Sequence, residues 1–305
     1  MSGTENLVTG SLSRDLGRAD TVTSHERAAA GAVAVLLCVH AGADPGQFDE
    51  ALASMRGQTY PDLRLYVYCD GPLTPALEAV LSSRVPVKDG QHSILRGVRS
   101  EGLPSGLNVL ITHALSEPDI AFMARMDADD ISLPERIETQ VRFLEDHPEV
   151  SIVGTWCVEF SQPGVPTFYK RMPASHAELT DFMLYRSPFN HPSVMFRRAV
   201  FEQGYRYNPT LKLMQDYDLW SRVVTAGFVI ANVPEFLLWF RIERNFFSRR
   251  AGVVRASREI RMRIHYARLM GKLRLANYPK YAGLFLVRVA PVWAKKLSYK
   301  YLRRI

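Results

Sequence analysis

Apolar and polar positions follow two different patterns along the first half of the chain. Four apolar runs have the length of strands that are buried on both faces of a sheet: 32–39, 63–69, 93–98 and 120–126. Three segments between them have the apolar spacing of helices: 48–56, 75–82 and 107–115. Strands and helices therefore alternate, which predicts an α/β fold with a mixed, mainly parallel sheet flanked by helices.

The second half of the chain is less regular. Three strand-like apolar segments occur there: 150–160, 189–196 and 228–240. One helix is expected to follow Ser132, its N-cap, with Pro134 in the first turn. Another helix is expected to begin near Asp216. These elements extend the predicted domain to about residue 245.

The net charge of +7 is unevenly distributed. Residues 241–305 contain 18 of the 38 Lys and Arg side chains but only 2 of the 31 Asp and Glu side chains, so the preceding part is acidic overall. We divide the chain into a mobile polar extension at 1–30, a globular domain at 31–245 and a basic, amphipathic, helical tail at 246–305. The extension lacks the apolar core of a secretion signal.

The tail has the composition of a helix that lies on a membrane surface. A basic helix is expected over 249–273, and a second apolar and basic segment over 281–305 should be interrupted by Pro291. Cations beside aromatic and aliphatic groups suit an anionic lipid surface. The alternative is a helical cap that packs on the globular domain and leaves a basic face in solvent.

Three aspartates directly follow the apolar run at 120–126. Asp127, Asp129 and Asp130 would repel one another at the end of a buried strand unless a cation lay between them. Hard oxygen ligands suit Mg²⁺ or Mn²⁺, so a divalent metal that carries a diphosphate is one interpretation. The other is a solvated acidic turn in which an aspartate caps the next helix.

Polar segments also follow two other predicted strands. His40, Ala41 and Gly42 come after the first strand, and Asp70 and Gly71 come after the second. Because ligands of open α/β sheets bind at the carboxyl ends of the strands, these segments and the aspartates are expected to share one crevice.

Several classes of protein are excluded or disfavoured by the sequence. GxxxxGK[ST] is absent, which excludes a P-loop enzyme, and no GxGxxG follows the first strand, which excludes a dinucleotide oxidoreductase. The three cysteines are far apart, so a disulfide framework and a zinc site are unsupported, and a reducing compartment is expected. No run of eighteen apolar residues predicts a spanning helix.

Seven motifs in order give the chain a resemblance to a known family. They are Ser54–Pro61 (SMRGQTYP), Asp70–Pro72 (DGP), Gly102–Asn108 (GLPSGLN), Arg125–Arg136 (RMDADDISLPER) with Gln140, Ile152–Gly154 (IVG), His191–Ser193 (HPS) and Asp216–Trp220 (DYDLW). Over about residues 32–245 the chain resembles the inverting family 2 glycosyltransferases with a GT-A fold. It is most similar to the bacterial subgroup that builds exopolysaccharides, such as the amylovoran-type transferases.

The resemblance implies where the donor, a UDP-, GDP- or dTDP-sugar, would bind. Asp70 would meet the nucleobase, and His40 and Ala41 would line its pocket. Asp127 would touch the ribose and, with Asp129, bind the Mn²⁺ or Mg²⁺ that bridges the diphosphate. Asp130 would support this site from behind, so residues 31–131 would form the nucleotide-binding half and 132–245 the acceptor-binding half.

Asp216 aligns with the aspartate that such enzymes use as general base on the acceptor hydroxyl. Asp218 is the rival candidate, and Asp216 is also a plausible helix cap. Gln215 stands where the family often has Glu, which affects donor-sugar or acceptor contacts. The Gln-x-x-Arg-Trp signature of processive synthases is absent, so one sugar is expected to be transferred per binding event.

Three further residues are weaker candidates for the site. His191 is either a metal or phosphate ligand or, more often beside a proline, a structural hydrogen-bonding residue. Arg96 and Asn108 lie in segments close to the expected crevice. In the segment before Gly102, Ser100 stands where members of the family commonly have asparagine, which weakens the assignment of that loop. Arg136 is expected to pair with a carboxylate beneath the site.

The resemblance also implies the setting of the reaction. The acceptor would be a saccharide linked to polyprenyl diphosphate, presented at the anionic inner leaflet, with the enzyme on the cytoplasmic face and no specific nucleic acid partner. Two rival functions remain. A sugar-nucleotidyltransferase should have a Gly-rich, Arg-containing loop after the first strand, and a non-catalytic polyanion-binding protein would depend on the basic tail alone.

Overall fold

The computed structural model describes residues 31–86, 91–211, 213–242 and 252–291. The predicted extension at 1–30 and the end of the predicted tail, 292–305, lie outside the described residues. Strands β1 (Ala32–Val39), β2 (Leu63–Cys69), β3 (Ser93–Arg96) and β4 (Ile120–Met126) form the parallel part of one sheet. Its strand order is β3-β2-β1-β4-β8-β6-β9-β5, and β7 pairs with β6.

The remaining strands make the sheet mixed. They are β5 (Ile131–Ser132), β6 (Val150–Gln162), β7 (Val165–Lys170), β8 (Met195–Arg197) and β9 (Val229–Arg241). β8 runs antiparallel between β4 and β6, whereas β6 and β9 are parallel. The sheet is therefore continuous from β3 to β9, and the mixed α/β fold that the sequence predicts is confirmed.

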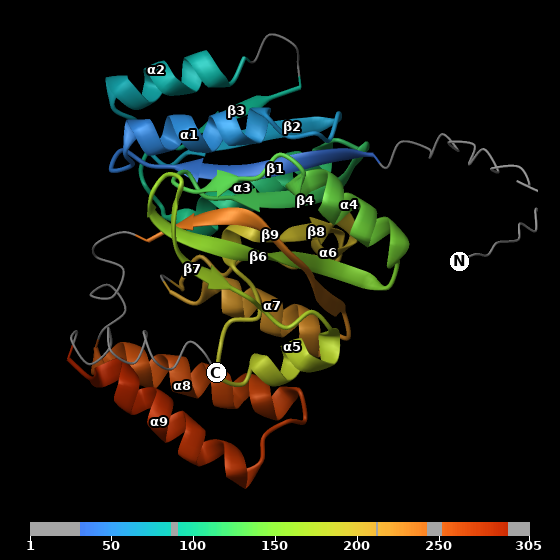
Figure 1. Cartoon of the computed structure of the whole chain (residues 1–305), viewed down its shortest axis with the longest axis vertical. Coiled ribbons are helices and arrows are strands. Elements are labelled where there is room, and N and C mark those ends of the chain that lie inside the picture. The colour runs from blue at the N-terminus through green and yellow to red at the C-terminus, as the bar shows by residue number, and fades with distance from the viewer. Residues whose placement is uncertain (1–30, 87–90, 212, 243–251, 292–305) are drawn as a thin grey trace, which may run out of the picture.

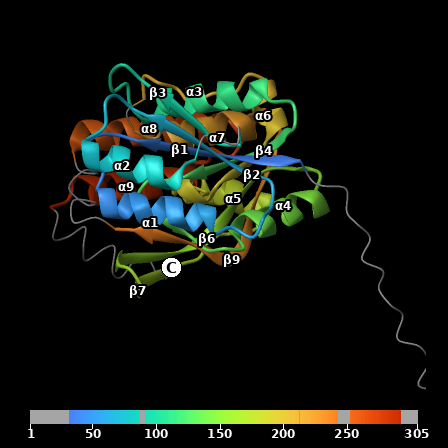
Figure 2. The same ribbon diagram turned by 90° about the horizontal axis from the view of Figure 1, so that it is seen from above.

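Helices cover both faces of this sheet (Figures 1 and 2). On one face lie α1 (Pro45–Arg56), α2 (Pro75–Arg84) and α4 (Arg136–Asp146); on the other lie α3 (Leu103–Ser116), α5 (His176–Phe182), α6 (Arg198–Glu202) and α7 (Gln215–Thr225). Alternate residues of β1 belong to the two separate cores: Val33 and Val35 face α1, and Ala34 and Leu36 face α3. Burial on both faces explains the continuous apolar run.

Several element boundaries differ from the predictions. The helix expected after Ser132 begins at Arg136 with Glu135 at its N-cap, because Ser132 belongs to β5 and its backbone N–H donates to Ser54 Oγ at 3.1 Å. The strand expected at 189–196 is confined to β8. A 3₁₀ turn, His191–Ser193, precedes it, because Pro192 has no N–H to offer a ladder.

The tail contains a helical hairpin that packs beneath α5 and α7 (Figure 1). It consists of α8 (Val253–Leu269) and α9 (Tyr278–Val289), joined by a 3₁₀ turn at Leu275–Asn277. The buried face of α8 combines two alanines, Ala256 and Ala267, with Glu259, Arg263 and Tyr266. α9 ends before Pro291, as predicted, and its Leu286 stays 64% exposed. None of the described helices combines the length and the apolar content needed to span a bilayer.

Candidate active site

The three aspartates after β4 form a compact cluster at the carboxyl end of the sheet. One carboxylate oxygen from each of Asp127, Asp129 and Asp130 lies within 4.8 Å of the other two. Asp127 and Asp129 are partly exposed, whereas Asp130 is buried. The cluster therefore has an open side formed by two carboxylates and a buried side formed by the third.

The cluster carries more negative charge than its surroundings balance. Burial, together with the charge of Asp127, raises the pKa of Asp129 to about 6. Burial and the two neighbouring carboxylates raise the pKa of Asp130 well above its usual value. The buried Oδ2 of Asp130 has no hydrogen-bond partner among the described residues. Three converging carboxylates with an unsatisfied oxygen fit a hard divalent cation such as Mg²⁺ or Mn²⁺.

Two arginines hold the aspartates in place. The buried Arg125, 2% exposed, forms an ion pair with Asp127. The backbone N–H of Arg241, at the end of β9, donates to Asp130 Oδ1 at 2.7 Å, and its Nε donates to the carbonyl of Asp129 at 2.7 Å. The loop after β4 is thus held by contacts with β4, through Arg125, and with β9, through Arg241.

Arg136 acts differently from its prediction. Its Nη1 donates to the carbonyls of Arg125, at 3.2 Å, and Pro192, at 2.6 Å, instead of pairing with a carboxylate. Burial lowers the pKa of Arg136 to about 9, although the charge of Asp130 opposes this shift. Arg136 therefore joins the end of β4 to the 3₁₀ turn of the second half.

The loops after β1 and β2 reach the same edge of the sheet. His40 and Ala41 are exposed, and His40 Nδ1 accepts from the N–H of Gly42 at 3.0 Å. Asp70 is buried and its carboxylate accepts from Ser100 Oγ at 2.7 Å and from the N–H of Glu101 at 2.7 Å. Asp70 therefore fixes the loop that leads into α3.

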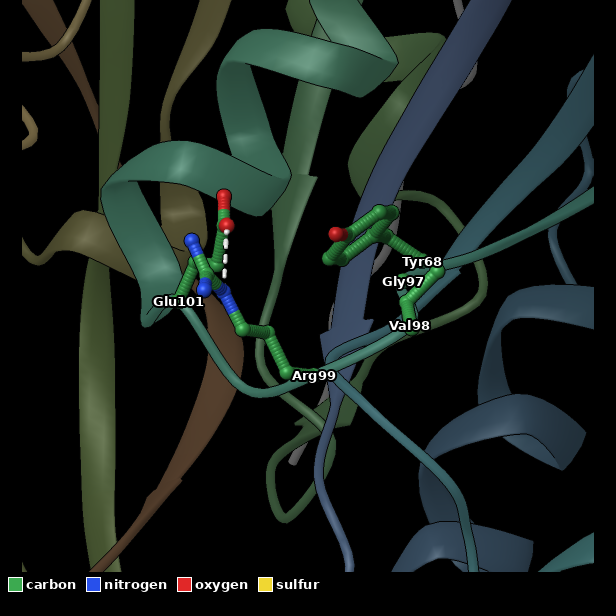
Figure 3. Close-up of a pocket in the computed structure, with 5 residues that line it drawn as sticks. All are labelled: Tyr68, Gly97, Val98, Arg99 and Glu101. Atoms are coloured by element: carbon green, nitrogen blue, oxygen red, sulfur yellow. Dashed lines mark hydrogen bonds and ion pairs between the residues drawn. The ribbon is translucent and has the colours of Figure 1, made fainter.

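A cavity of about 380 Å³ lies beside this loop (Figure 3). Its lining residues are Tyr68, Gly97, Val98, Arg99 and Glu101. An added Cβ at position 97 would lie 2.4 Å from the Tyr68 hydroxyl, so Gly97 lets the Tyr68 side chain come close to this part of the backbone. Arg99 Nε donates to Glu101 Oε1 at 3.1 Å across from the Tyr68 ring. The cavity thus has an aromatic wall and a charged rim.

Asp216 lies in the first turn of α7. The charges of Asp216 and of Asp127 in the cluster both act on the hydroxyl of one residue, Tyr207. Burial raises the pKa of the Tyr207 hydroxyl; Arg125 lowers it, and the charges of Asp216 and Asp127 both raise it further. Tyr207 therefore lies within electrostatic reach of Asp216 on α7 and of the end of β4. The partly exposed Asp216 accepts from the N–H of Tyr217 at 2.7 Å through Oδ1.

Asp218 faces the interior and has two strong partners. Its Oδ1 accepts from the Tyr266 hydroxyl at 2.6 Å, and its Oδ2 accepts from Arg222 Nε at 2.9 Å. Gln215, the first residue of α7, is partly exposed beside Asp216. Asp216 itself is inside the helix and is not its N-cap, a position that Met214 occupies.

The three weaker candidates have structural partners. His191 Nε2 lies 2.9 Å from the Tyr207 hydroxyl, and burial together with Arg125 lowers its pKa well below the usual value. Asn108 exchanges two hydrogen bonds with the backbone of Tyr207, at 2.8 and 2.9 Å. Arg96 forms a two-pronged ion pair with Glu78 on α2. These contacts favour the structural alternative for His191.

Arg125 and Tyr207 were not among the predicted site residues. Arg125 forms an ion pair with Asp127 of the cluster, and the charge of Asp127 acts on the Tyr207 hydroxyl. A charged side chain inside an apolar strand is rarely buried without a specific role, so Arg125 carried a sequence signal of its own. Tyr207 comes from an irregular segment, and only the folded chain places it beside His191 and Asn108.

Comparison with solved structures shows which fold the chain has. The chain superimposes on a mannosyltransferase from Pyrobaculum calidifontis, solved with GDP-Man and Mn²⁺, with a TM-score of 0.58 at 15% identity, over 90% of this chain and 82% of the other. It superimposes on residues 1–349 of TarS from S. aureus, solved with UDP-GlcNAc, with a TM-score of 0.56 at 14% identity, over 89% and 85% of the two chains. The fold is that of the GT-A glycosyltransferases.

The sequence comparison gives the family. Residues 40–204 match the family described as glycosyl transferase family 2, and the chain belongs to it. An uncharacterized glycosyltransferase of Haemophilus influenzae is 31% identical over 88% of this chain and 98% of its own length. The amylovoran biosynthesis glycosyltransferase AmsE of Erwinia amylovora is 30% identical over 83% and 91%. The predicted resemblance is thereby confirmed, and the chain is a glycosyltransferase.

A further relative has a more detailed name. The UDP-Gal:alpha-D-GlcNAc-diphosphoundecaprenol beta-1,3-galactosyltransferase of Escherichia coli is 26% identical over 264 residues, which are 86% of this chain and 90% of its own length. All three relatives are matched over nearly their whole length, and the alignments extend beyond the family match at 40–204.

Proposed function

We propose that the protein transfers one sugar from a nucleoside diphosphate sugar to a hydroxyl of a saccharide acceptor, with inversion, in the synthesis of a cell-surface polysaccharide or glycolipid. The observation that carries the proposal is the aspartate cluster at the end of β4, with its unsatisfied buried oxygen, in a chain of this family. A nucleoside diphosphate brings the negative charge that a metal held by such a cluster would balance.

The donor site extends from the cluster to the end of β2. Asp127 and Asp129 would hold Mn²⁺ or Mg²⁺, with Asp127 also near the ribose and Asp130 behind them. The metal would supply Lewis-acid stabilisation of the leaving diphosphate. The nucleobase would lie near His40, Ala41 and the loop that Asp70 fixes, where the cavity has an aromatic wall. The solved relatives bind UDP-GlcNAc and GDP-Man, which supports this class of donor.

Asp216 is the proposed general base. It is partly exposed in the first turn of α7, whereas both carboxylate oxygens of Asp218 accept hydrogen bonds from buried or half-buried donors. A carboxylate within hydrogen-bond reach of the acceptor hydroxyl would take its proton as the oxygen attacks the anomeric carbon. Attack on the face opposite the leaving diphosphate inverts the configuration at that carbon.

The proposed acceptor is a saccharide linked to polyprenyl diphosphate. Two relatives support it, because one is named for amylovoran biosynthesis and the other for a diphosphoundecaprenol acceptor. The helical hairpin would bring the enzyme to the anionic cytoplasmic surface that presents such an acceptor. Its exposed Leu275, Tyr278 and Leu286 lie among arginines and lysines, a composition that suits an interfacial contact.

The donor site can be tested by ligand-induced thermal stabilisation. Wild type, Asp129→Asn and Asp62→Asn would be heated with UDP-, GDP- and dTDP-sugars, each with MnCl₂ or EDTA. Asp62 is the matched control, since it is an exposed carboxylate at the opposite end of β2. We expect one nucleotide class to raise the melting temperature of wild type and Asp62→Asn in manganese only, with no shift for Asp129→Asn. Equal shifts for all three proteins in EDTA would refute a metal-bridged donor site.

A further inference from the structure

The helix that carries the proposed base begins in an unusual conformation. Met214, at its N-cap, has φ 61° and ψ 20°, and it is the sole non-glycine residue with positive φ in the described part of the chain. The Met214 side chain does not cap the helix, and the first turn has instead the hydrogen bond from the N–H of Tyr217 to Asp216 Oδ1. A left-handed methionine is strained, and such strain persists only where the surroundings hold it. The position of Asp216 therefore depends on contacts from other elements.

Some of those contacts come from α8. Glu259, Arg263 and Tyr266 are spaced by four and three residues, so they form one stripe on that helix, and all three are buried. The Tyr266 hydroxyl donates to Asp218 Oδ1 at 2.6 Å. The Arg263 guanidinium lies 4.7 Å from the centre of the Tyr217 ring. The two residues that follow Asp216 are thus both contacted by α8.

The same contacts continue into the rest of the fold. The Tyr217 hydroxyl and Arg263 Nη1 donate to one carbonyl, that of Met183 after α5, at 2.9 and 3.0 Å. Arg288 of α9 donates through Nε to Glu259 Oε2 at 2.9 Å, and Arg263 donates to Oε1 of the same carboxylate at 2.9 Å. The hairpin is therefore joined to α7 by a buried polar network.

Within that network, Tyr266 has the most direct effect on the first turn of α7. Asp218 accepts from Tyr266 on one oxygen and from Arg222 on the other, so its carboxylate is held from two sides. Its backbone N–H donates to the carbonyl of Met214 at 2.9 Å. A shift of Asp218 would move the strained turn, and with it Asp216, two residues earlier.

We infer that Tyr266 is a positioning residue for the transfer reaction: its hydrogen bond to Asp218 sets the distance between Asp216 and the acceptor hydroxyl. This inference rests on the proposed role of Asp216 as general base. Tyr266 itself contacts neither the substrate nor the metal. It lies on α8, so the helical tail contributes to catalysis through the hydrogen bond from Tyr266 to Asp218. Misplacement of a catalytic group by about 1 Å can lower a rate by about 10²-fold, so the effect should appear in kcat.

The test replaces one hydroxyl in the full-length chain. Tyr266→Phe removes the donor to Asp218 and keeps the ring. Tyr281→Phe on α9 is the matched control, because Tyr281 is equally buried and its hydroxyl has no hydrogen-bond partner among the described residues. We expect Tyr266→Phe to lower kcat by about tenfold or more with the donor KM unchanged, and Tyr281→Phe to match wild type. A kcat equal to that of wild type, or a loss that only follows a lower melting temperature, would overturn the inference.

A double-mutant cycle separates this inference from the proposed function. If Asp216 is the base, Asp216→Asn alone lowers kcat strongly, and adding Tyr266→Phe to it has little further effect. An Asp216→Asn enzyme of normal activity would refute the base and leave Tyr266 without this role. If Asp216→Asn lowers kcat strongly and Tyr266→Phe lowers it further by its full factor in the double variant, the positioning role alone is refuted.

Discussion

Replacing Asp129 by asparagine should stabilise the metal-free protein while it abolishes metal-dependent donor binding. Asp129 is partly buried and lies beside Asp127, and its pKa of about 6 compares with 3.8 for an unperturbed aspartate. In the metal-free state at neutral pH the folded chain therefore holds a carboxylate that it disfavours. An amide of nearly the same shape removes that charge.

The size of the effect follows from the shift in pKa. One unit of difference between folded and unfolded pKa corresponds to about 1.4 kcal/mol, so a rise from 3.8 to about 6 gives about 3 kcal/mol. Between these two pH values the folded chain keeps a proton that the unfolded chain has released. The contribution of Asp129 to the free energy of unfolding of the wild type should therefore fall by about that amount as pH rises from about 4 to about 6.

Urea unfolding in EDTA at pH 4 and pH 7 measures this difference. Asp129→Asn should match wild type at pH 4 and exceed it by up to about 3 kcal/mol at pH 7, while Asp62→Asn stays close to wild type at both. Manganese with the matching nucleotide should stabilise the wild type at pH 7 and leave Asp129→Asn unchanged. An Asp129→Asn protein that is less stable than wild type in EDTA at pH 7 would refute the reasoning.

Three other outcomes are expected. Asp216→Asn should keep donor affinity and lower kcat about 10²–10⁴-fold through loss of the base, whereas Asp218→Asn should cost far less in steady-state assays; the reverse order would assign the base to Asp218. Glu259→Gln should lower the free energy of unfolding by about 3 kcal/mol in urea titrations, because the buried Arg263 and the half-buried Arg288 lose their anion; no measurable loss would contradict this. Ending the chain after Pro291 should weaken sedimentation with anionic liposomes and preserve donor-induced stabilisation; unchanged sedimentation would argue against a membrane role for 292–305.

Much of the parallel half of the fold follows from its apolar runs. The segments 32–39, 63–69 and 120–126 coincide with β1, β2 and β4, because a strand buried on both faces needs apolar residues at every position. Helix starts were harder to place. α3 begins at Leu103, four residues before its expected start, since Gly102 at φ 90° and Pro104 in the first turn open the helix ahead of its apolar face.

The short and irregular elements depend on contacts between distant segments. β5 has two residues, Ile131 and Ser132, and it exists because β9 pairs with it from about a hundred positions away. β8 has three residues and owes its place to β4 and β6 on either side. A segment of two or three residues is too short to show a periodic pattern of apolar and polar positions, so the local sequence could not distinguish these strands from loops.

The candidate site also contains some features that the sequence predicts and others that depend on contacts between distant segments. The aspartates at 127–130 and Asp70 were predicted from their places after strands, whereas Asp216 was predicted from the resemblance to the family. The catalytic roles of all these residues stay predictions. The docking of α8 on α7 had no such signal, because its buried face includes charged residues and the only aliphatic side chains there are two alanines. Glu259 and Arg263 look like members of a solvated basic helix until Arg288 and the carbonyl of Met183 complete their contacts.

The most direct test of the account is to locate the metal. Crystals of the wild type grown with MnCl₂ and the nucleotide that gives the largest stabilisation would be measured at the manganese absorption edge. We predict one anomalous peak within coordination distance of an Asp129 carboxylate oxygen, between it and the diphosphate, which is absent from Asp129→Asn crystals. A nucleotide bound with no manganese at this position, or a peak that persists in Asp129→Asn, would contradict the central claim.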